Sequence, residues 1–253
     1  MFRRIIIISS VIALICFTLV GCAVDDAAQK KRAQALETLG MSLVKKGDLR
    51  GGLRELLRAL ELNPENPDLN HELALVYREL GQYQLSLEHF KKAVSLRPGF
   101  SEAWNNMGTV YLVLQKWDLA ISSFEKALEE ITYGTPETAY NNIGLAFYNK
   151  GEYEKAIENY NRALKVFPAY TICLRNLGLA YEAVDQKDSA IQAYKKAISL
   201  DPQYAAAHFD LGRLYLDVGK KVEAAEQLML AIEIDPDGII ATESRKLLRT
   251  IRH

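Results

Sequence analysis

The chain has 253 residues, of which 25% are charged, and its net charge is −1. That near balance provides no broad basic surface of the kind that binds nucleic acid. The 4 histidines are scattered without a His-x3-His pair, the 3 cysteines supply no partner for them, and no glycine-rich phosphate loop is present, so we expect no catalytic residue, no metal and no cofactor.

The N-terminus has the pattern of an export signal. Two arginines precede an apolar run, residues 5–20, which is shorter than the roughly 20 apolar residues that a membrane-spanning helix needs. The run ends at Leu19-Val20-Gly21-Cys22, which resembles the lipobox of bacterial lipoproteins. This resemblance implies a signal peptide over residues 1–21, a lipid on Cys22 and a tether over residues 22–32. The alternative is an uncleaved anchor helix with an incidental cysteine.

The residue that follows the lipidated cysteine predicts the location. In the Gram-negative lipoproteins that the lipobox resembles, an aspartate at this place retains the protein at the inner membrane, whereas here Ala23 follows Cys22. We therefore expect lipid anchoring in the outer membrane, with the body on its periplasmic face; the inner membrane is the alternative. Cys173 is then the single thiol of the folded body, and we expect it to be a packing residue, with a reactive thiol as the alternative.

A pattern with a period of about 34 residues runs through the rest of the chain. Its clearest unit begins at Ser101 and contains Trp104-x2-Met107-Gly108-x2-Tyr111, followed by Ala120-x3-Phe124-x2-Ala127. This sequence resembles the tetratricopeptide repeat almost letter for letter. In the same frame, six units cover residues 33–66, 67–100, 101–136, 137–170, 171–204 and 205–238.

Each unit predicts a hairpin of two helices. The eighth position is always small, which lets the two helices touch, and a glycine ends the first helix in four of the units. Gln115 and Asp185 replace that glycine in the third and fifth units. Because glutamine adopts the left-handed conformation less readily than aspartate, the third turn is predicted to be the most irregular. The residues at the eighth position are Gly40, Ala74, Gly108, Gly144, Gly178 and Gly212.

The fold that we predict is all-α, a right-handed α-solenoid in which neighbouring hairpins share a continuous core. Residues 239–253 predict a capping helix, because Leu247 and Leu248 lie on one side of it and Arg245 and Arg249 on the other. A membrane-surface role for this basic helix is the alternative.

Function is expected on the first helix of each hairpin. In the tetratricopeptide family, partners bind a concave groove lined by repeat positions 2, 5, 9, 12 and 13; in this chain these positions form a largely apolar floor with scattered polar groups. A protein or peptide partner with an apolar face is expected there, unless the capping helix or a neighbouring turn of the solenoid covers the floor. The candidate groove residues are Met41, Val44, His71, Leu75, Arg78, Asn105, Leu112, Asn141, Leu145, Tyr148, Arg175, Leu179, Phe209 and Arg213.

The third unit is two residues longer than the others, through Thr132-Tyr133-Gly134-Thr135-Pro136. An outer-membrane lipoprotein with six such repeats and this insertion resembles the type IV pilus biogenesis and stability lipoproteins, the pilotins. The resemblance implies a non-catalytic scaffold that aids outer-membrane localisation and multimerisation of the secretin, with a secretin subunit as partner. A loop variant without functional meaning is the alternative for the insertion. The alternative functions are an adaptor for periplasmic peptidoglycan hydrolases and a scaffold of another envelope or secretion complex.

Overall fold

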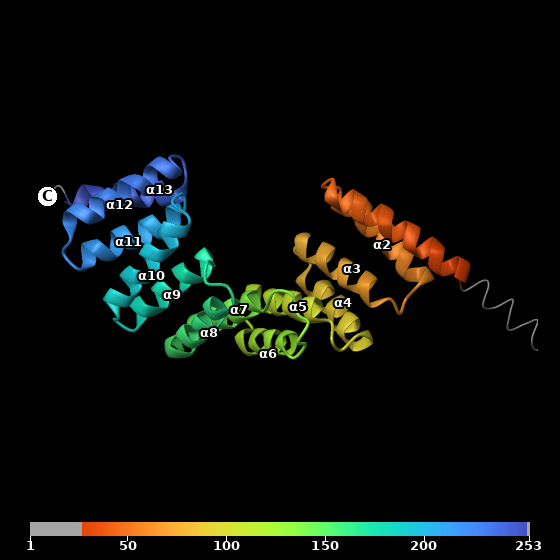
Figure 1. Cartoon of the computed structure of the whole chain (residues 1–253). Helices are drawn as coiled ribbons and strands as arrows, with labels where there is room; N and C mark the ends of the chain where they lie inside the picture. Colours follow the sequence, from red (N-terminus) through yellow and green to blue (C-terminus); the bar gives the residue numbers. More distant parts are fainter. Residues whose placement is uncertain (1–26, 252–253) are drawn as a thin grey trace, which may run out of the picture. The chain divides into compact units, whose positions relative to one another are not determined.

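The computed structural model describes residues 27–251, and all regular structure within that range is helical (Figure 1). The all-α fold predicted from the sequence is therefore confirmed. The predicted signal peptide, Cys22 and the first part of the tether lie outside the described residues. Within residues 27–251, no helix combines the length and the apolar character needed to cross a membrane.

The helices follow one another as hairpins, in which we name the opening member the first helix and the closing member the second helix. The earliest first helix spans residues 27–45. The helices after it are α2 (Leu49–Leu62), α3 (Pro67–Glu79), α4 (Tyr83–Leu96), α5 (Ser101–Val113), α6 (Trp117–Leu128), α7 (Pro136–Asn149), α8 (Tyr153–Val166), α9 (Thr171–Ala183), α10 (Lys187–Leu200), α11 (Ala205–Asp217), α12 (Lys221–Ile234) and α13 (Ile239–Ile251).

The chain divides into two compact units, one ending at Val110 and the other beginning at Tyr111. The core of the first unit contains Leu56 and Leu73, both fully buried where α2 and α3 meet the helix of residues 27–45. In the second unit, Tyr160 of α8 and Tyr194 of α10 fill the corresponding place. Each unit thus buries one apolar side of every helix against its neighbours, which is the packing that the repeat pattern predicts.

Small residues at the eighth repeat position are required by the contact between the two helices of a hairpin. A Cβ atom added to Gly144 would lie 2.6 Å from Cε1 of Tyr160, and one added to Gly212 would lie 2.8 Å from Cγ of Leu228. Real Cβ atoms do not approach other atoms so closely in a packed interior. Glycine at these positions is therefore a packing requirement.

The third turn is regular, so the predicted irregularity at Gln115 is wrong. Gln115 has φ 56° and Asp185 has φ 58°, both in the left-handed region that Gly151 adopts with φ 79°. The N–H of Gln115 donates to the carbonyl of Leu112 at 2.9 Å, and the N–H of Gly151 donates to the carbonyl of Tyr148 at the same distance. The hydrogen bonds of the turn thus impose the conformation on glutamine, although it costs an L-residue about 1–2 kcal/mol.

The insertion of the third unit forms an ordered connection between α6 and α7. Tyr133 is buried, and its backbone N–H donates to the carbonyl of Glu130 at 3.1 Å. Ile131, in the same connection, is 98% exposed. Thr135 then precedes Pro136, whose fixed φ suits the first turn of α7.

Helix α13 lies within residues 239–253, where the sequence predicts a capping helix, and it packs on α12 and α11. Ala241 and Ser244 are its buried residues. Arg245, Lys246 and Arg249 are exposed and occupy the seventh, eighth and eleventh positions of a continued repeat frame. Earlier first helices use those positions to contact their own second helix, so these charged residues end the array with a polar surface.

Cys173 is a packing residue, as predicted. It is fully buried in α9, and its thiol donates to the carbonyl of Tyr160 at 3.4 Å. Burial raises the pKa of this thiol to about 12. Because the thiolate is the nucleophilic form of cysteine, burial and the raised pKa both disfavour reaction at Cys173.

Candidate functional site

The candidate groove residues all lie on first helices, and we name the set within each compact unit the first-helix face of that unit. All of them are partly buried except Asn141, which is buried. Met41 and Val44 lie in the helix of residues 27–45 and pack on the core of the first unit. The others lie on α3 (His71, Leu75, Arg78), α5 (Asn105, Leu112), α7 (Asn141, Leu145, Tyr148), α9 (Arg175, Leu179) and α11 (Phe209, Arg213).

Polar side chains on both first-helix faces connect successive first helices. In the first unit, the ring nitrogen Nε2 of His71 lies 3.0 Å from Nδ2 of Asn106, and Arg78 donates to Oδ1 of Asn106 at 3.4 Å. Burial lowers the pKa of His71, so the imidazole is neutral at pH 7. In the second unit, Asn176 donates to Oδ1 of Asn141 at 3.1 Å. Several of the polar groups on these faces therefore serve to hold neighbouring repeats in register.

Charged side chains of the second unit gather on α9 and α11, where we name them the charged cluster. Arg175 donates to Asp210 at 2.6 Å, and Arg213 donates to Glu182 at 2.7 Å. The hydroxyl of Tyr194 also donates to Glu182, at 2.5 Å. The side chain of Asp210 is only 5% exposed, and burial raises its pKa, while Arg175 opposes that rise.

The charged cluster changes the description of this face that the sequence suggested. In the second unit the charged groups of this face are concentrated on two helices, α9 and α11, and each arginine is matched by one carboxylate. Asp210, Glu182 and Tyr194 were absent from the predicted site. The separation of Arg175 and Asp210, one repeat plus one residue, was the signal that could have identified the first pair.

A shallow cavity of about 390 Å³ lies on the first unit, beside Met41. Glu72, one of the two glutamates that line it, has a buried carboxylate oxygen, Oε2, without a hydrogen-bond partner among the described residues. Burial, and then the charges of Glu37 and Asp68, raise the pKa of Glu72 to about 7. The cavity is lined by Glu37, Thr38, Met41, Ser42, Lys45 and Glu72.

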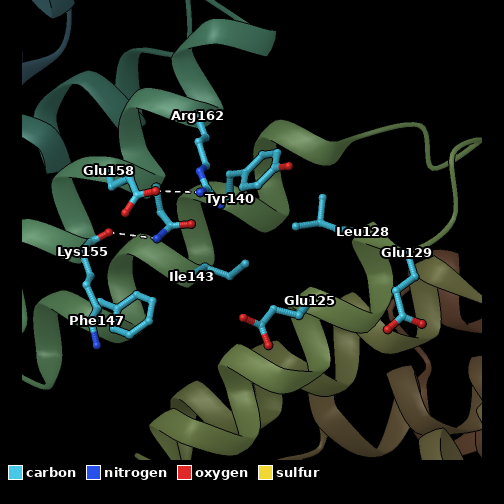
Figure 2. A pocket seen from close by; sticks show the side chains of 10 residues that line it. Glu125, Leu128, Glu129, Tyr140, Ile143, Phe147, Lys155, Glu158 and Arg162 are labelled. Carbon is cyan, nitrogen blue, oxygen red and sulfur yellow. Dashed lines mark hydrogen bonds and ion pairs between the residues drawn. The ribbon is translucent and has the colours of Figure 1, made fainter.

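A second cavity, of about 380 Å³, lies between α6, α7 and α8 (Figure 2). Tyr140, Ile143 and Phe147 of α7 form its apolar wall. On α8, Arg162 donates to Glu158 at 2.6 Å, and the ammonium group of Lys155 lies 5.3 Å from the centre of the Phe147 ring. The rest of the lining is Glu125 and Leu128 of α6, Glu129 directly after that helix, and Asn159 of α8.

The same cavity recurs one repeat later, with a volume of about 390 Å³. Leu174, Leu177 and Tyr181 replace the apolar wall, and Asn161 and Gln192 stand where Glu125 and Glu158 stand in the earlier cavity. The repeat geometry itself therefore produces this hollow between successive second helices. Its volume does not mark a ligand site, and only its lining distinguishes one repeat from the next.

Histidine and acidic side chains of the described residues make contacts between helices. Within residues 27–251, no group of three or more His, Cys, Asp or Glu side chains is placed to hold a metal ion. His208 is hydrogen-bonded to Gln227 at 2.8 Å and to the carbonyl of Pro202 at 3.1 Å, and His89 is hydrogen-bonded to Asn70 at 3.1 Å. These histidines connect helices within a unit and do not orient a nucleophile.

Solved structures resemble this chain over most of its length. PilW, described as a widely conserved type IV pilus biogenesis factor, has a TM-score of 0.75 at 22% identity, covering 87% of this chain and 98% of PilW. The pilF protein of Pseudomonas aeruginosa has a TM-score of 0.73 at 18% identity, covering 87% and 99%. YrrB, described as a TPR protein with an unusual peptide-binding site, has a TM-score of 0.58 at 23% identity, covering 76% and 97%. These likenesses show a shared fold.

The amino-acid sequence matches models of one protein family over most of its length. No curated protein sequence matches the chain. Models of the tetratricopeptide repeat match residues 37–101, 100–169, 135–203 and 185–242. Together with the stacked hairpins, these matches show that the chain belongs to the tetratricopeptide repeat family.

Proposed function

We propose that this protein is a non-catalytic scaffold that assists type IV pilus biogenesis. The observation that carries the proposal is the extent of the likeness to PilW and pilF, which are matched over 98% and 99% of their length and over 87% of this chain. The long third unit and the lipobox-like sequence at Cys22 support the same assignment. A subunit of the secretin, the outer-membrane channel of the pilus, is the partner that we propose.

The first-helix face of the second unit is the proposed binding surface for that partner. Leu112 and Leu145 are partly exposed there and offer apolar contacts. The ion pairs of the charged cluster are already satisfied within the protein, so they fix α9 and α11 in place before a partner arrives. Such preorganisation lowers the entropy cost of binding. The peptide-binding site named for YrrB supports the view that this fold can present a peptide surface.

The lipid on Cys22 is the proposed anchor at the inner leaflet of the outer membrane. Each buried methylene of an acyl chain contributes about 0.8 kcal/mol, so a multiply acylated cysteine holds a protein firmly at the bilayer. A Cys22→Ala variant is expected to appear in the soluble periplasmic fraction, folded. If that variant stays with the membrane, the anchoring proposal is wrong.

Deletion of the gene tests the pilus role. The strain is scored for detergent-resistant secretin multimers and for twitching motility, and then complemented with the wild-type gene or with a Leu112→Glu, Leu145→Glu variant. The wild type is expected to restore both readouts, and the variant neither. A matched control, Asn161→Glu with Lys195→Glu, changes exposed residues on the second helices α8 and α10 and is expected to complement fully.

Equal stability of the two variants, measured by thermal unfolding, makes this comparison meaningful. Unchanged multimers and normal twitching in the deletion strain would contradict the pilus role. Altered levels of periplasmic peptidoglycan hydrolases in the same strain would point to the adaptor function instead.

A further inference from the structure

The outward-facing positions of the second helices differ between the sixth repeat and the second to fifth repeats; in the first repeat, position 25 is the partly buried Leu57. In the second to fifth repeats, positions 18, 25 and 26 carry exposed polar or charged side chains. In the sixth repeat the same positions carry Val222, Met229 and Leu230, which are 70%, 53% and 39% exposed. The polar residues of the earlier repeats are Gln84, Lys91, Lys92, Asp118, Glu125, Lys126, Glu154, Asn161, Arg162, Asp188, Lys195 and Lys196.

These apolar side chains are not needed for the packing of α12. Its inward side is completed by Ala224, Leu228 and Ala231, all fully buried, and α13 lies beside it (Figure 1). Helix α12 is therefore apolar on its outer side as well as its inner side. A helix with apolar residues on both sides is normally covered on both. We name the exposed side the α12 outer face.

The α12 outer face is also acidic. Glu226 and Glu233 alternate with Val222 and Met229 at the helical spacings of four and three residues, so the four side chains form one line along the helix. Glu223, two helical turns before Leu230, is also exposed. Among the described residues, none of the three glutamates takes part in an ion pair.

The charge and size of the face select its partner. Self-association through this face would bring like-charged glutamates together. A few exposed side chains also bury much less surface than the roughly 800 Å² per partner of a standard protein interface. An anionic membrane surface would be repelled by the same glutamates. A short segment of a partner protein can place apolar side chains against Val222, Met229 and Leu230 and cationic side chains against the glutamates, and it therefore fits both the charge and the small size of the face.

We propose that the α12 outer face is a second docking surface, separate from the first-helix face of the second unit, which binds an amphipathic segment of a partner protein whose apolar side chains alternate with lysines or arginines. The proposal does not rest on the pilus role, since it follows from the comparison among the repeats of this chain.

Fluorescence anisotropy of two labelled synthetic peptides tests the proposal on the full-length mature protein. One peptide is an amphipathic helix of leucine and lysine, and the other has glutamate in place of lysine. The test variant is Val222→Gln with Met229→Asn, which introduces the uncharged residues found at the same positions in the second and fourth repeats. The matched control is Asp188→Gln with Lys195→Asn, on the outer side of α10.

The wild type and the control are expected to bind the leucine–lysine peptide, and the test variant to bind it about tenfold more weakly, because two central apolar contacts are lost. A Glu226→Gln, Glu233→Gln variant is expected to weaken binding and to reduce its dependence on salt. Little binding of the leucine–glutamate peptide is expected.

Three results would overturn the proposal. The first is equal affinity of the wild type and the test variant for the leucine–lysine peptide. The second is self-association of the wild type, measured by sedimentation, that the test variant abolishes, because the occupant would then be a second copy. The third is binding to phosphatidylglycerol vesicles, by protein that lacks the lipid, that the test variant loses.

Discussion

Replacing Gln115 by glycine is expected to stabilise the second unit. Gln115 has a left-handed backbone, with φ 56°, at the end of α5. That conformation costs an L-residue about 1–2 kcal/mol, whereas glycine adopts it without strain but loses about 0.5–1 kcal/mol more entropy on folding. The difference predicts a gain of about 0.5–1 kcal/mol, which corresponds to a rise in Tm of about 1–4 °C for a unit of this size.

The companion variants make this prediction selective. Asp185 has φ 58° at the equivalent turn, but aspartate tolerates the left-handed region better, so Asp185→Gly is expected to gain less than Gln115→Gly. Gly151→Gln introduces the same backbone strain, so its free energy of unfolding is expected to fall by about as much as that of Gln115→Gly rises. Urea unfolding followed by circular dichroism measures all three. If Gln115→Gly destabilises the protein, or Gly151→Gln leaves it unchanged, the assignment of strain to these turns is refuted.

Three further predictions concern packing and charge. Gly178→Ala is expected to lose about 1–3 kcal/mol in urea unfolding, because the added Cβ would meet the Tyr194 ring. Asp210→Ala is expected to lose about 2–4 kcal/mol in the same assay, because Arg175 is left without its charge partner; a loss below 1 kcal/mol would contradict a structural role for the pair. The folded-state pKa of Glu72, about 7, exceeds its usual 4.5, so the folded protein binds this proton more tightly than the unfolded chain does. The resulting contribution to the free energy of unfolding is complete below pH 4.5 and is lost as the pH rises through 7. Allowing for partial exposure, about 1–2 kcal/mol of pH-dependent stability should disappear in Glu72→Gln, and an unchanged pH profile of Tm would show that Glu72 titrates normally.

The sequence predicted the hairpins because their requirements are local and periodic. Gly144 and Tyr160 illustrate this, since the small residue and the ring that covers it recur at fixed positions in the frame. The turn at Gln115 was mispredicted because only the low preference of glutamine for the left-handed backbone conformation was considered. Two helices and the hydrogen bonds between them override a preference of 1–2 kcal/mol or so.

The charged cluster was harder to predict than the core. Arg175 and Asp210 meet because successive first helices lie side by side, which brings position 5 of one repeat to position 6 of the next. Apolar periodicity does not indicate which polar side chains make such contacts between repeats. The α12 outer face, in contrast, is visible in the sequence once outward positions are compared across repeats, as the inward positions were.

The recurring hollow between second helices has a consequence for how this protein can acquire specificity. Its shape is set by helix spacing, so the lining of one repeat can change while the backbone and the neighbouring hollows stay as they are. Two successive hollows show this difference in lining: one carries Glu125 and Glu158, and the next carries Asn161 and Gln192 at the same repeat positions. Selection can therefore alter the charge of one hollow at a time, with little loss of stability elsewhere.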